Sequence, residues 1–192
     1  MTRARILLIA GSTRDGSFNQ SLVSAATRKF NAAGADALPL SLQDYDMPLC
    51  DAGVSERGIP DAVTALHALF AAHDGIFLAT PEYNSFPSPL LLNMIDWLSR
   101  VRHYEGGMIE AFERSVFGIG AASPSPIGGY RALMMLRQKL ALGVGATVVP
   151  AMIAVSAAYQ AFDAEGNLAN EQDAQNLDKV VHQLLEAVRQ RA

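Results

Sequence analysis

The feature that most constrains the fold is a regular alternation of short apolar runs with longer segments of helical spacing. Five apolar runs are predicted as buried strands, at residues 5–10, 37–42, 75–80, 115–123 and 147–155. Helical spacing follows each of them, at 17–33, 60–73, from about 90, 130–142 and 171–189. Strands that alternate with helices in this way form right-handed βαβ units around a parallel sheet. We therefore predict an α/β fold, a doubly wound five-stranded sheet in the order 2-1-3-4-5 with helices on both faces.

The composition favours one domain that spans residues 1–192. Half of the residues (50%) are hydrophobic, which is enough for one sizeable core, and no segment resembles a linker or a repeat. The formal net charge of −4 argues against nucleic acid as a partner, because phosphate contacts need a basic face. The single cysteine, Cys50, excludes an internal disulfide framework and suits a reducing cytoplasm, where we expect the protein.

Neither membrane association nor a metal site is expected. No basic segment precedes the first apolar run, which argues against a secretory signal. Residues 140–162 carry no charge over the length of a membrane span, but glycines, a proline and polar residues interrupt them. The four histidines lack metal-ligand spacing, and the aspartates between 44 and 51 are not spaced as a calcium loop.

Three loops are the candidate ligand-binding segments. In doubly wound sheets, ligands bind outside the carboxyl ends of the strands, at the point where the strand order reverses. That rule selects the loops at 11–19, 81–89 and 123–129, which are also the least generic stretches of the chain. Two independent criteria therefore agree on the place of the site.

The loop at 11–19, GSTRDGSFN, has the residues of a phosphate site. It lacks the second glycine of a dinucleotide fingerprint, and a Ser-Phe pair stands where a nucleoside-triphosphate loop needs lysine and a hydroxyl. A terminal monophosphate needs only backbone N–H groups at a helix N-terminus and a few donors. Ser12, Ser17 and Asn19 can donate, and Arg14 adds a charge-assisted contact. A helix cap by Ser17 or Asn19 is the alternative, but it does not explain Arg14 and Ser12.

The other two loops carry weaker indications. At 81–89, Tyr83 offers an aromatic face and Asn84 offers amide donors to a flat heteroaromatic ring, although the loop can also be a turn with a tyrosine lid. Glu82 is unexpected beside a reducible ring, because a carboxylate disfavours added negative charge. We expect it to point away and pair with a cation. The loop at 123–129 ends in two glycines, which permit close approach to a ligand or simply make a tight connection.

Two stretches resemble the signatures of a known family. GSTRDGSFNQSL at 11–22 and PEYNSFPSPLLLNMIDWLSR at 81–100 are similar to the two signatures of the NADPH-dependent FMN reductase family, the flavodoxin-like quinone, azo-dye and chromate reductases. The resemblance runs along nearly the whole chain and includes GGYRALMMLRQKLALGVGATVVP at 128–150. It implies a flavodoxin-like fold, bound FMN, NADPH or NADH as electron donor, and a homodimer or homotetramer.

The same resemblance implies the residues that bind the cofactor. Those expected to hold the FMN phosphate are Ser12, Arg14, Ser17 and Asn19. Those expected to line the isoalloxazine and ribityl side are Pro81, Glu82, Tyr83, Asn84 and Ser85, and Ser123 would lie near the flavin. No side chain is expected to be catalytic, because the hydride is transferred to N5 of FMN.

One departure from the family pattern stands out. The family usually has a lysine before Asn93, where this chain has Leu92. The helix that carries this position lies at a subunit contact in the family, so the polar part of that contact is in question here. Arg100 or Arg102, later in the chain, are the candidate partners for Glu82.

The implied activity is electron transfer from NAD(P)H through FMN to a small acceptor, namely a quinone, an azo compound, a metal oxyanion or a flavin. We expect a ping-pong mechanism in which the nicotinamide leaves before the acceptor enters the same face, with backbone N–H groups of the last two loops stabilising the charge. The alternatives are a flavodoxin-type one-electron carrier and a non-catalytic FMN-binding redox sensor. Against the carrier, Arg14 stands where flavodoxins have a run of serine and threonine.

Overall fold

The computed structural model describes residues 3–51, 53, 58–101 and 110–191. Its central sheet is built from five parallel strands: β1 (Arg5–Ala10), β2 (Asp36–Leu40), β3 (Gly75–Ala79), β6 (Val116–Ala122) and β7 (Thr147–Val155). Their spatial order is β2-β1-β3-β6-β7, which is the predicted doubly wound order once the strands are counted along the sheet alone.

The position of each strand in the sheet follows from its residues. β3 and β6 are buried at every position, and β1 is buried at every position after Arg5, because helices cover both faces of these inner strands. The two outer strands each contain a proline, Pro39 in β2 and Pro150 in β7. Proline has no backbone N–H to donate to a neighbouring strand. It is therefore tolerated in the outermost strands of a sheet but not in the inner strands, which pair on both sides.

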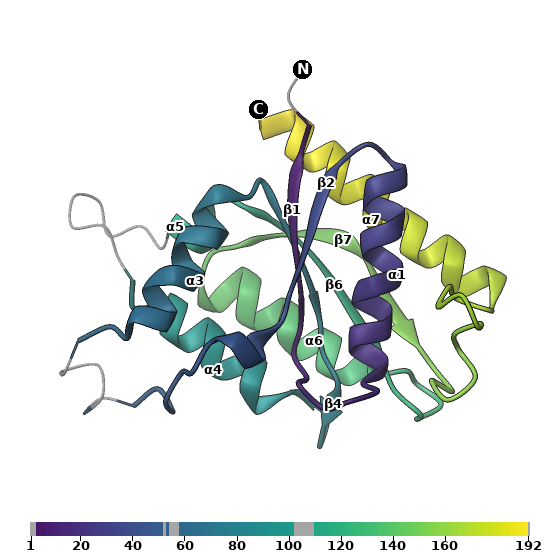
Figure 1. Ribbon diagram of the computed structural model, residues 1–192, viewed down its shortest axis with the longest axis horizontal. Helices are drawn as coiled ribbons and strands as arrows, with labels where there is room; N and C mark the ends of the chain where they lie inside the picture. The colour runs from purple at the N-terminus through teal and green to yellow at the C-terminus, as the bar shows by residue number, and fades with distance from the viewer. Residues whose placement is uncertain (1–2, 52, 54–57, 102–109, 192) are drawn as a thin grey trace.

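Helices cover the sheet in two layers (Figure 1). One face packs against α1 (Phe18–Ala32) and α7 (Glu171–Arg191). The other packs against α3 (Asp61–Ala72), α4 (Pro89–Leu98) and α6 (Tyr130–Gln138), with the short α5 (Glu110–Glu113) beside α3. Within the described residues, none of the helices combines the length and the apolar character that crossing a bilayer requires.

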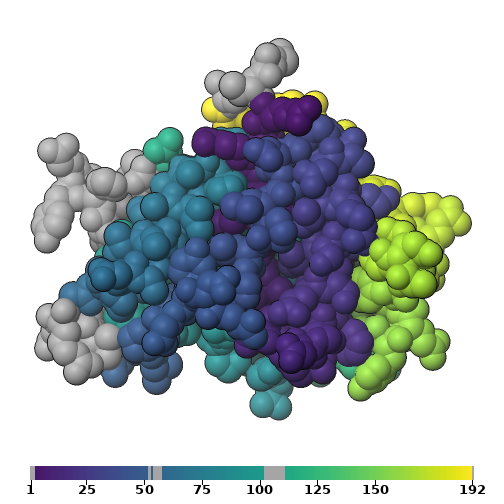
Figure 2. Space-filling model, viewed as in Figure 1, coloured from purple at the N-terminus to yellow at the C-terminus, as the bar shows by residue number. Residues whose placement is uncertain are grey.

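Because the five strands are parallel, their amino ends all lie along one edge of the sheet and their carboxyl ends along the opposite edge. These two edges are called the amino edge and the carboxyl edge. Both chain termini lie at the top of Figure 1, and the short strand β4 (Glu82–Tyr83) lies at the bottom, where the parallel strands have their carboxyl ends. Figure 2 shows the segment that follows β1, in purple, reaching the surface at this lower edge. The loops at 11–19, 81–89 and 123–129 follow β1, β3 and β6, so all three meet there.

Two segments differ from their predicted form. Residues 81–89, predicted as a loop, contain a small antiparallel hairpin of β4 (Glu82–Tyr83) and β5 (Phe86–Pro87). Its turn residues Asn84 and Ser85 have φ values of 51° and 71°, which is the left-handed geometry that two-residue hairpin turns require and that asparagine tolerates. The helix predicted at 130–142 ends as a π-helical turn, Lys139–Gly143.

Candidate functional site

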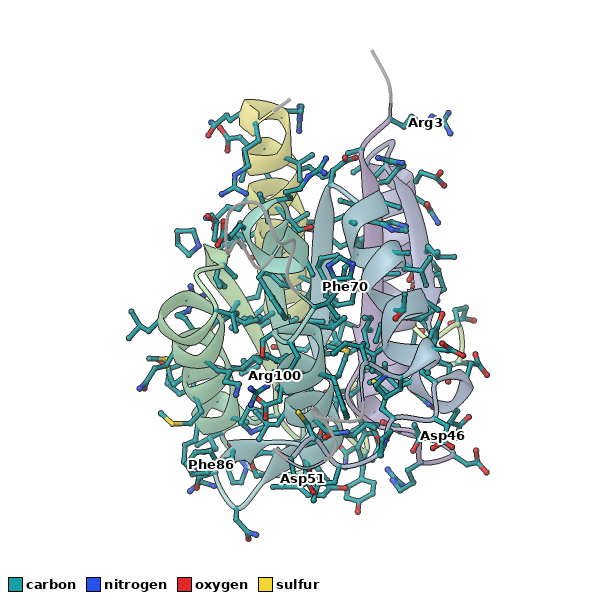
Figure 3. All side chains as sticks on the ribbon, turned by 90° about the vertical axis from the view of Figure 1, so that its left-hand side faces the viewer. Arg3, Asp46, Asp51, Phe70, Phe86 and Arg100 are labelled. Carbon is teal, nitrogen blue, oxygen red and sulfur yellow. The ribbon has the colours of Figure 1, made fainter. Side chains whose placement is uncertain are left out.

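A cleft of about 240 Å³ lies at the carboxyl edge, where the three predicted loops meet. The residues that line it are Ser12, Arg14, Ser17, Phe18, Asn19, Pro81, Glu82, Tyr83, Ala122, Ser123, Pro124 and Tyr159. The structure therefore brings together most of the residues implied by the resemblance. Asn84 and Ser85 are the exceptions, because they form the hairpin turn and do not line this cleft. In Figure 3 the hairpin residue Phe86 lies at the bottom and Arg3, at the opposite edge, lies at the top.

The amino end of α1 has the form of an anion cradle. Ser17 is the N-cap residue and is buried, but its hydroxyl makes no capping hydrogen bond to the helix. The first turn of α1 contains no acidic side chain, and helix geometry leaves its first N–H groups without carbonyl partners. Arg14 lies beside this helix end, with its Cζ 5.7 Å from the centre of the Phe18 ring and only a long 3.4 Å contact from Nη2 to the carbonyl of Gly16. Hydrogen-bond donors thus converge on the cleft.

Asn19 ties the first loop to the middle of the sheet. It is nearly fully buried, with 2% of its surface exposed. Its Nδ2 donates to the carbonyl of Ala122 over 3.0 Å, and the N–H of Ala122 donates to Oδ1 over 2.9 Å. This pair of bonds fixes the start of α1 against the end of β6. Because one hydrogen on Nδ2 is left over, a contact with phosphate stays a prediction.

A second tie joins the first loop to the second. The hydroxyl of Ser88 donates to the carbonyl of Gly11 over 2.5 Å, and the N–H of Gly11 donates to the carbonyl of Ala79 over 2.7 Å. Position 11 has no room for a larger residue, since an added Cβ would lie 2.8 Å from the Ser88 hydroxyl. These bonds fix the loop at 11–19 against the segment where the hairpin passes into α4.

A third tie joins the second loop to α6 through Glu82. Its side chain is only 6% exposed. Oε1 accepts from Nε of Arg131 over 2.9 Å and also from Nη2, and Oε2 accepts from the N–H of Ala132 over 3.2 Å. The N-cap residue of α6, Gly129, supplies no side-chain cap, and the first turn has no acidic residue of its own. Glu82 thus caps α6 from a different segment of the chain.

Glu82 is held in its ionised form. Burial alone would raise the pKa of this carboxyl, but the hydrogen bond from the Arg131 side chain, the N–H of Ala132 and the positive charge of Arg131 outweigh burial and lower the pKa below its ordinary 4.5. The expectation that Glu82 pairs with a cation is confirmed, but Glu82 does not lie apart from the site, because it is one of the residues that line the cleft. The expected partner was wrong: it is Arg131, because the hairpin folds onto the start of α6, whereas Arg102 lies outside the described residues.

The two glycines of the third loop make a tight connection. Gly128 has a φ of 62°, and an added Cβ would lie 2.8 Å from backbone atoms of residues 154–156. The close approach that this position permits is therefore to β7. Ser123 continues the contact, since its N–H donates to the carbonyl of Val155 over 3.0 Å.

Sequence reasoning missed one wall of the cleft. The ring of Tyr159 meets the ring of Phe18 edge-on, with 5.1 Å between their centres, and 79% of the tyrosine is exposed. Tyr159 follows the carboxyl end of β7, so the rule that selected the other loops also applied to this one. The only signal was its place after an outer strand.

Part of the α4 surface is covered by the chain itself. Oδ1 of Asn93 accepts from the N–H of Cys50 over 2.8 Å, and Nε1 of Trp97 donates to the carbonyl of Pro48 over 2.6 Å. The segment that precedes α3 is thereby held against this helix. Leu92, which replaces the family lysine, is half-buried.

Comparison with known proteins gives consistent matches. The model of the family described as NADPH-dependent FMN reductase matches residues 4–160. An NAD(P)H-dependent FMN reductase of Pseudomonas aeruginosa is 34% identical over 169 residues, which cover 87% of this chain and 85% of that protein. A quinone reductase of Escherichia coli is 36% identical over 142 residues, 72% of this chain and 70% of that protein. A flavoenzyme NAD(P)H:(acceptor) oxidoreductase from Paracoccus denitrificans has the same fold, with a TM-score of 0.81 at 22% identity over 98% of each chain.

Proposed function

The chain belongs to the NADPH-dependent FMN reductase family, and on that premise we propose that it passes electrons from NAD(P)H through bound FMN to a small quinone. The observation that carries this proposal is the cleft in which a cradle of donors at the start of α1 faces the hairpin β4–β5. The names of the relatives, which include a quinone reductase and a 2-hydroxy-1,4-benzoquinone reductase, support a quinone as acceptor.

The residues present fit the phosphate of FMN. A phosphate monoester dianion needs donors and positive charge, and the cleft supplies the unused Ser17 hydroxyl, the start of α1 and the guanidinium of Arg14. We assign the phosphate to Ser12, Arg14 and Ser17, with Asn19 acting through its hydrogen bonds to Ala122. No acidic side chain in the first turn of α1 opposes this assignment.

The flavin ring is assigned to the surface beside the hairpin. The cleft, at about 240 Å³, is smaller than the roughly 300–1,000 Å³ of typical enclosed ligand sites, so it suits the phosphate end of a mononucleotide better than the whole molecule. Pro81, Tyr83 and Ser123 lie on the same cleft and are assigned to the ring and ribityl side. Asn84 and Ser85, in the exposed turn, are assigned to the open side of the ring.

Bound FMN supplies the redox chemistry, since its ring accepts a hydride from a nicotinamide and passes electrons to an acceptor. The chain supplies position and electrostatics. Of the residues that line the cleft, Glu82 is the one carboxylate, and it is ionised and bound to Arg131. It therefore does not act as a proton donor, and no protein acid is assigned to the reaction.

A ping-pong mechanism follows if donor and acceptor use the same open side of the cleft in turn. Initial-rate plots against NADPH at several quinone concentrations should then give parallel lines. Intersecting lines would exclude the proposal that the two substrates take turns at one place.

The reductase is separated from an electron carrier or a redox sensor by one spectroscopic experiment. Anaerobic addition of NADPH should bleach the flavin absorption of the purified protein, and addition of a quinone should restore it. A flavin that binds but is not reduced by NADPH would favour the carrier or the sensor.

We also propose that the protein forms a homodimer or homotetramer. Large apolar side chains of the hairpin and the start of α6 are exposed together: Tyr83 (55%), Phe86 (54%), Tyr130 (49%) and Ile127 (43%). Such a patch beside an active site is typical of a protein interface. Light scattering after size-exclusion chromatography tests this, and a monomer at micromolar concentration would contradict it. The single cysteine supports a reducing compartment such as the cytoplasm.

A further inference from the structure

Glu82 is the one acidic residue among those that line the cleft, and an acidic residue beside a site that receives electrons needs an explanation. Reduction adds electron density to the flavin ring, and a nearby negative charge opposes it. Glu82 nevertheless lines the cleft, with its side chain almost fully buried, so water does little to screen it. Among the described residues, the structure shows what offsets this charge: two hydrogen bonds from Arg131 and one from the N–H of Ala132.

We propose that Glu82 and Arg131 form a neutral pair that positions the hairpin and sets the preference of the cleft for reduced over oxidised FMN. The inference rests on the proposed function, because it concerns the cleft assigned to FMN. Glu82 is a positioning residue: its carboxylate fastens β4 to the start of α6. The positive charge of Arg131 offsets the negative charge that the Glu82 carboxylate places beside the cleft.

The geometry supports both parts of the proposal. The bonds from Nε and Nη2 of Arg131 reach the same oxygen, Oε1, while Oε2 is taken by the backbone of α6, so both carboxylate oxygens have partners. The guanidinium itself is 57% exposed, whereas the carboxylate is 6% exposed. Removal of Arg131 therefore leaves a buried charge next to the cleft, and removal of the Glu82 charge leaves a cation that water can solvate.

The pair could act only by holding the hairpin in place, or it could also balance charge at the cleft. These two roles predict different effects of the single variants on the binding of oxidised and reduced FMN. If the pair only fastens the hairpin, loss of either partner weakens the binding of both redox forms of FMN to a similar degree. If the pair also balances charge, Arg131→Gln disfavours the reduced form and Glu82→Gln favours it. The two single variants then shift the reduction potential in opposite directions.

The experiment measures the dissociation constants of oxidised and reduced FMN, and the midpoint potential of the bound flavin, in the parent, Glu82→Gln, Arg131→Gln and the double variant. We expect the ratio of the two dissociation constants to change by about threefold to tenfold in each single variant, with opposite signs. For a two-electron couple this corresponds to roughly 14–30 mV. The double variant should return to within about twofold of the parent.

Two controls make the result decisive. Lys29→Gln removes one positive charge from an exposed ion pair with Asp178 near the carboxyl end of α1 and should leave the ratio unchanged. Arg131→Lys, which keeps the charge but not the double contact, should restore most of the potential. The thermal midpoints of the apoproteins report any loss of folding separately.

Shifts of the same sign in both single variants, or ratios within twofold of the parent, would overturn the inference while leaving the proposed function intact. A parent protein that fails to bind FMN would instead overturn the proposed function, and the inference with it.

Discussion

The structure has a cavity at the amino ends of the strands and a cleft at their carboxyl ends. The larger of the two lies at the amino ends, away from the loops assigned to FMN. The cavity at the amino edge has a volume of about 810 Å³, against about 240 Å³ for the cleft at the carboxyl edge. Five arginines line the larger cavity: Arg3, Arg5, Arg114, Arg189 and Arg191. By size and charge alone it would be the better site for an anion.

Contacts within the chain hold three of these arginines, Arg5, Arg189 and Arg191. Nη1 of Arg191 donates to the carbonyl of Glu113 over 3.2 Å, Nε of Arg189 donates to the carbonyl of Leu185 over 3.1 Å, and Arg5 pairs with Asp74 at 3.6 Å. α1, α3 and α7 all end at this edge and present the negative ends of their dipoles, which attract cations and repel anions.

The carboxyl edge has the opposite polarity. There α1 begins, and among the residues that the structure describes neither the Ser17 hydroxyl nor the Arg14 guanidinium has a strong hydrogen-bond partner. We therefore assign the anionic ligand to the carboxyl edge on the direction of the helices and not on the volume of the cavity.

The largest effect is expected for Asn19→Ala. The substitution leaves the buried N–H and carbonyl of Ala122 without partners, so the free energy of unfolding should fall by roughly 2–4 kcal/mol. Urea unfolding of the apoprotein measures it. The matched control is Asn31→Ala near the other end of α1, whose exposed carboxamide accepts one 3.2 Å bond from Ala37 and should cost less than about 1 kcal/mol. If both variants lost the same free energy of unfolding, the hydrogen bonds between Asn19 and Ala122 would not contribute more to stability than an exposed one.

Arg14→Ala should weaken FMN binding by roughly 1.5–3 kcal/mol, which is about one to two decades in the dissociation constant. The reason is the loss of a charge-assisted contact to phosphate. Fluorescence titration with FMN measures the effect. Arg3→Ala, at the amino edge, removes the same charge and should leave the dissociation constant within about twofold. An equal loss in both variants would mean that only net charge matters.

Arg191→Ala should change stability without changing FMN affinity. Its guanidinium donates to the carbonyls of Glu113, at the end of α5, and Arg114, and to the hydroxyl of Thr147, so its removal should lower the free energy of unfolding by about 1 kcal/mol. Thermal unfolding and FMN titration of the same samples separate the two quantities. Weaker FMN binding with unchanged stability would place an anion site at the amino edge.

The smallest effect is the pH dependence contributed by Glu82. Because its pKa is lowered in the folded protein, the stability that its ionised form adds is present above about pH 4.5 and is lost as the pH falls through the folded pKa. The difference in unfolding free energy between the parent and Glu82→Gln should therefore shrink below pH 4.5. A difference that grows in acid would contradict the direction of the shift.

Much of the fold was predictable because a strand that is buried on both faces of a sheet is a continuous run of apolar residues. Among the inner strands, β1 has the predicted bounds, β3 ends one residue early, and β6 is one residue shorter at each end. The topological rule then placed Ser12, Arg14 and Tyr83 on one cleft. The hairpin at 82–87 was missed because its strands have two residues each, which is too short for any periodicity.

The contacts that complete the site depend on tertiary structure. Arg131 is far from Glu82 in the chain, and nothing in the local pattern distinguishes it from Arg100 as a partner. The amide of Asn19 was expected at a phosphate, but its hydrogen bonds to Ala122 depend on how β6 lies beside α1. Sequence patterns predicted which residues line the cleft, whereas the hydrogen-bond partner of each side chain was known only from the structure.

The central claim is that the start of α1 holds a phosphate, and it is tested most directly by comparing FMN with riboflavin, which lacks that phosphate. The dissociation constants of both should be measured for the parent and for Arg14→Ala. We expect the parent to bind FMN far more tightly than riboflavin, and Arg14→Ala to narrow this gap by about one to two decades while riboflavin binding stays nearly unchanged. A parent that binds the two flavins equally, or a variant that loses both equally, would contradict it.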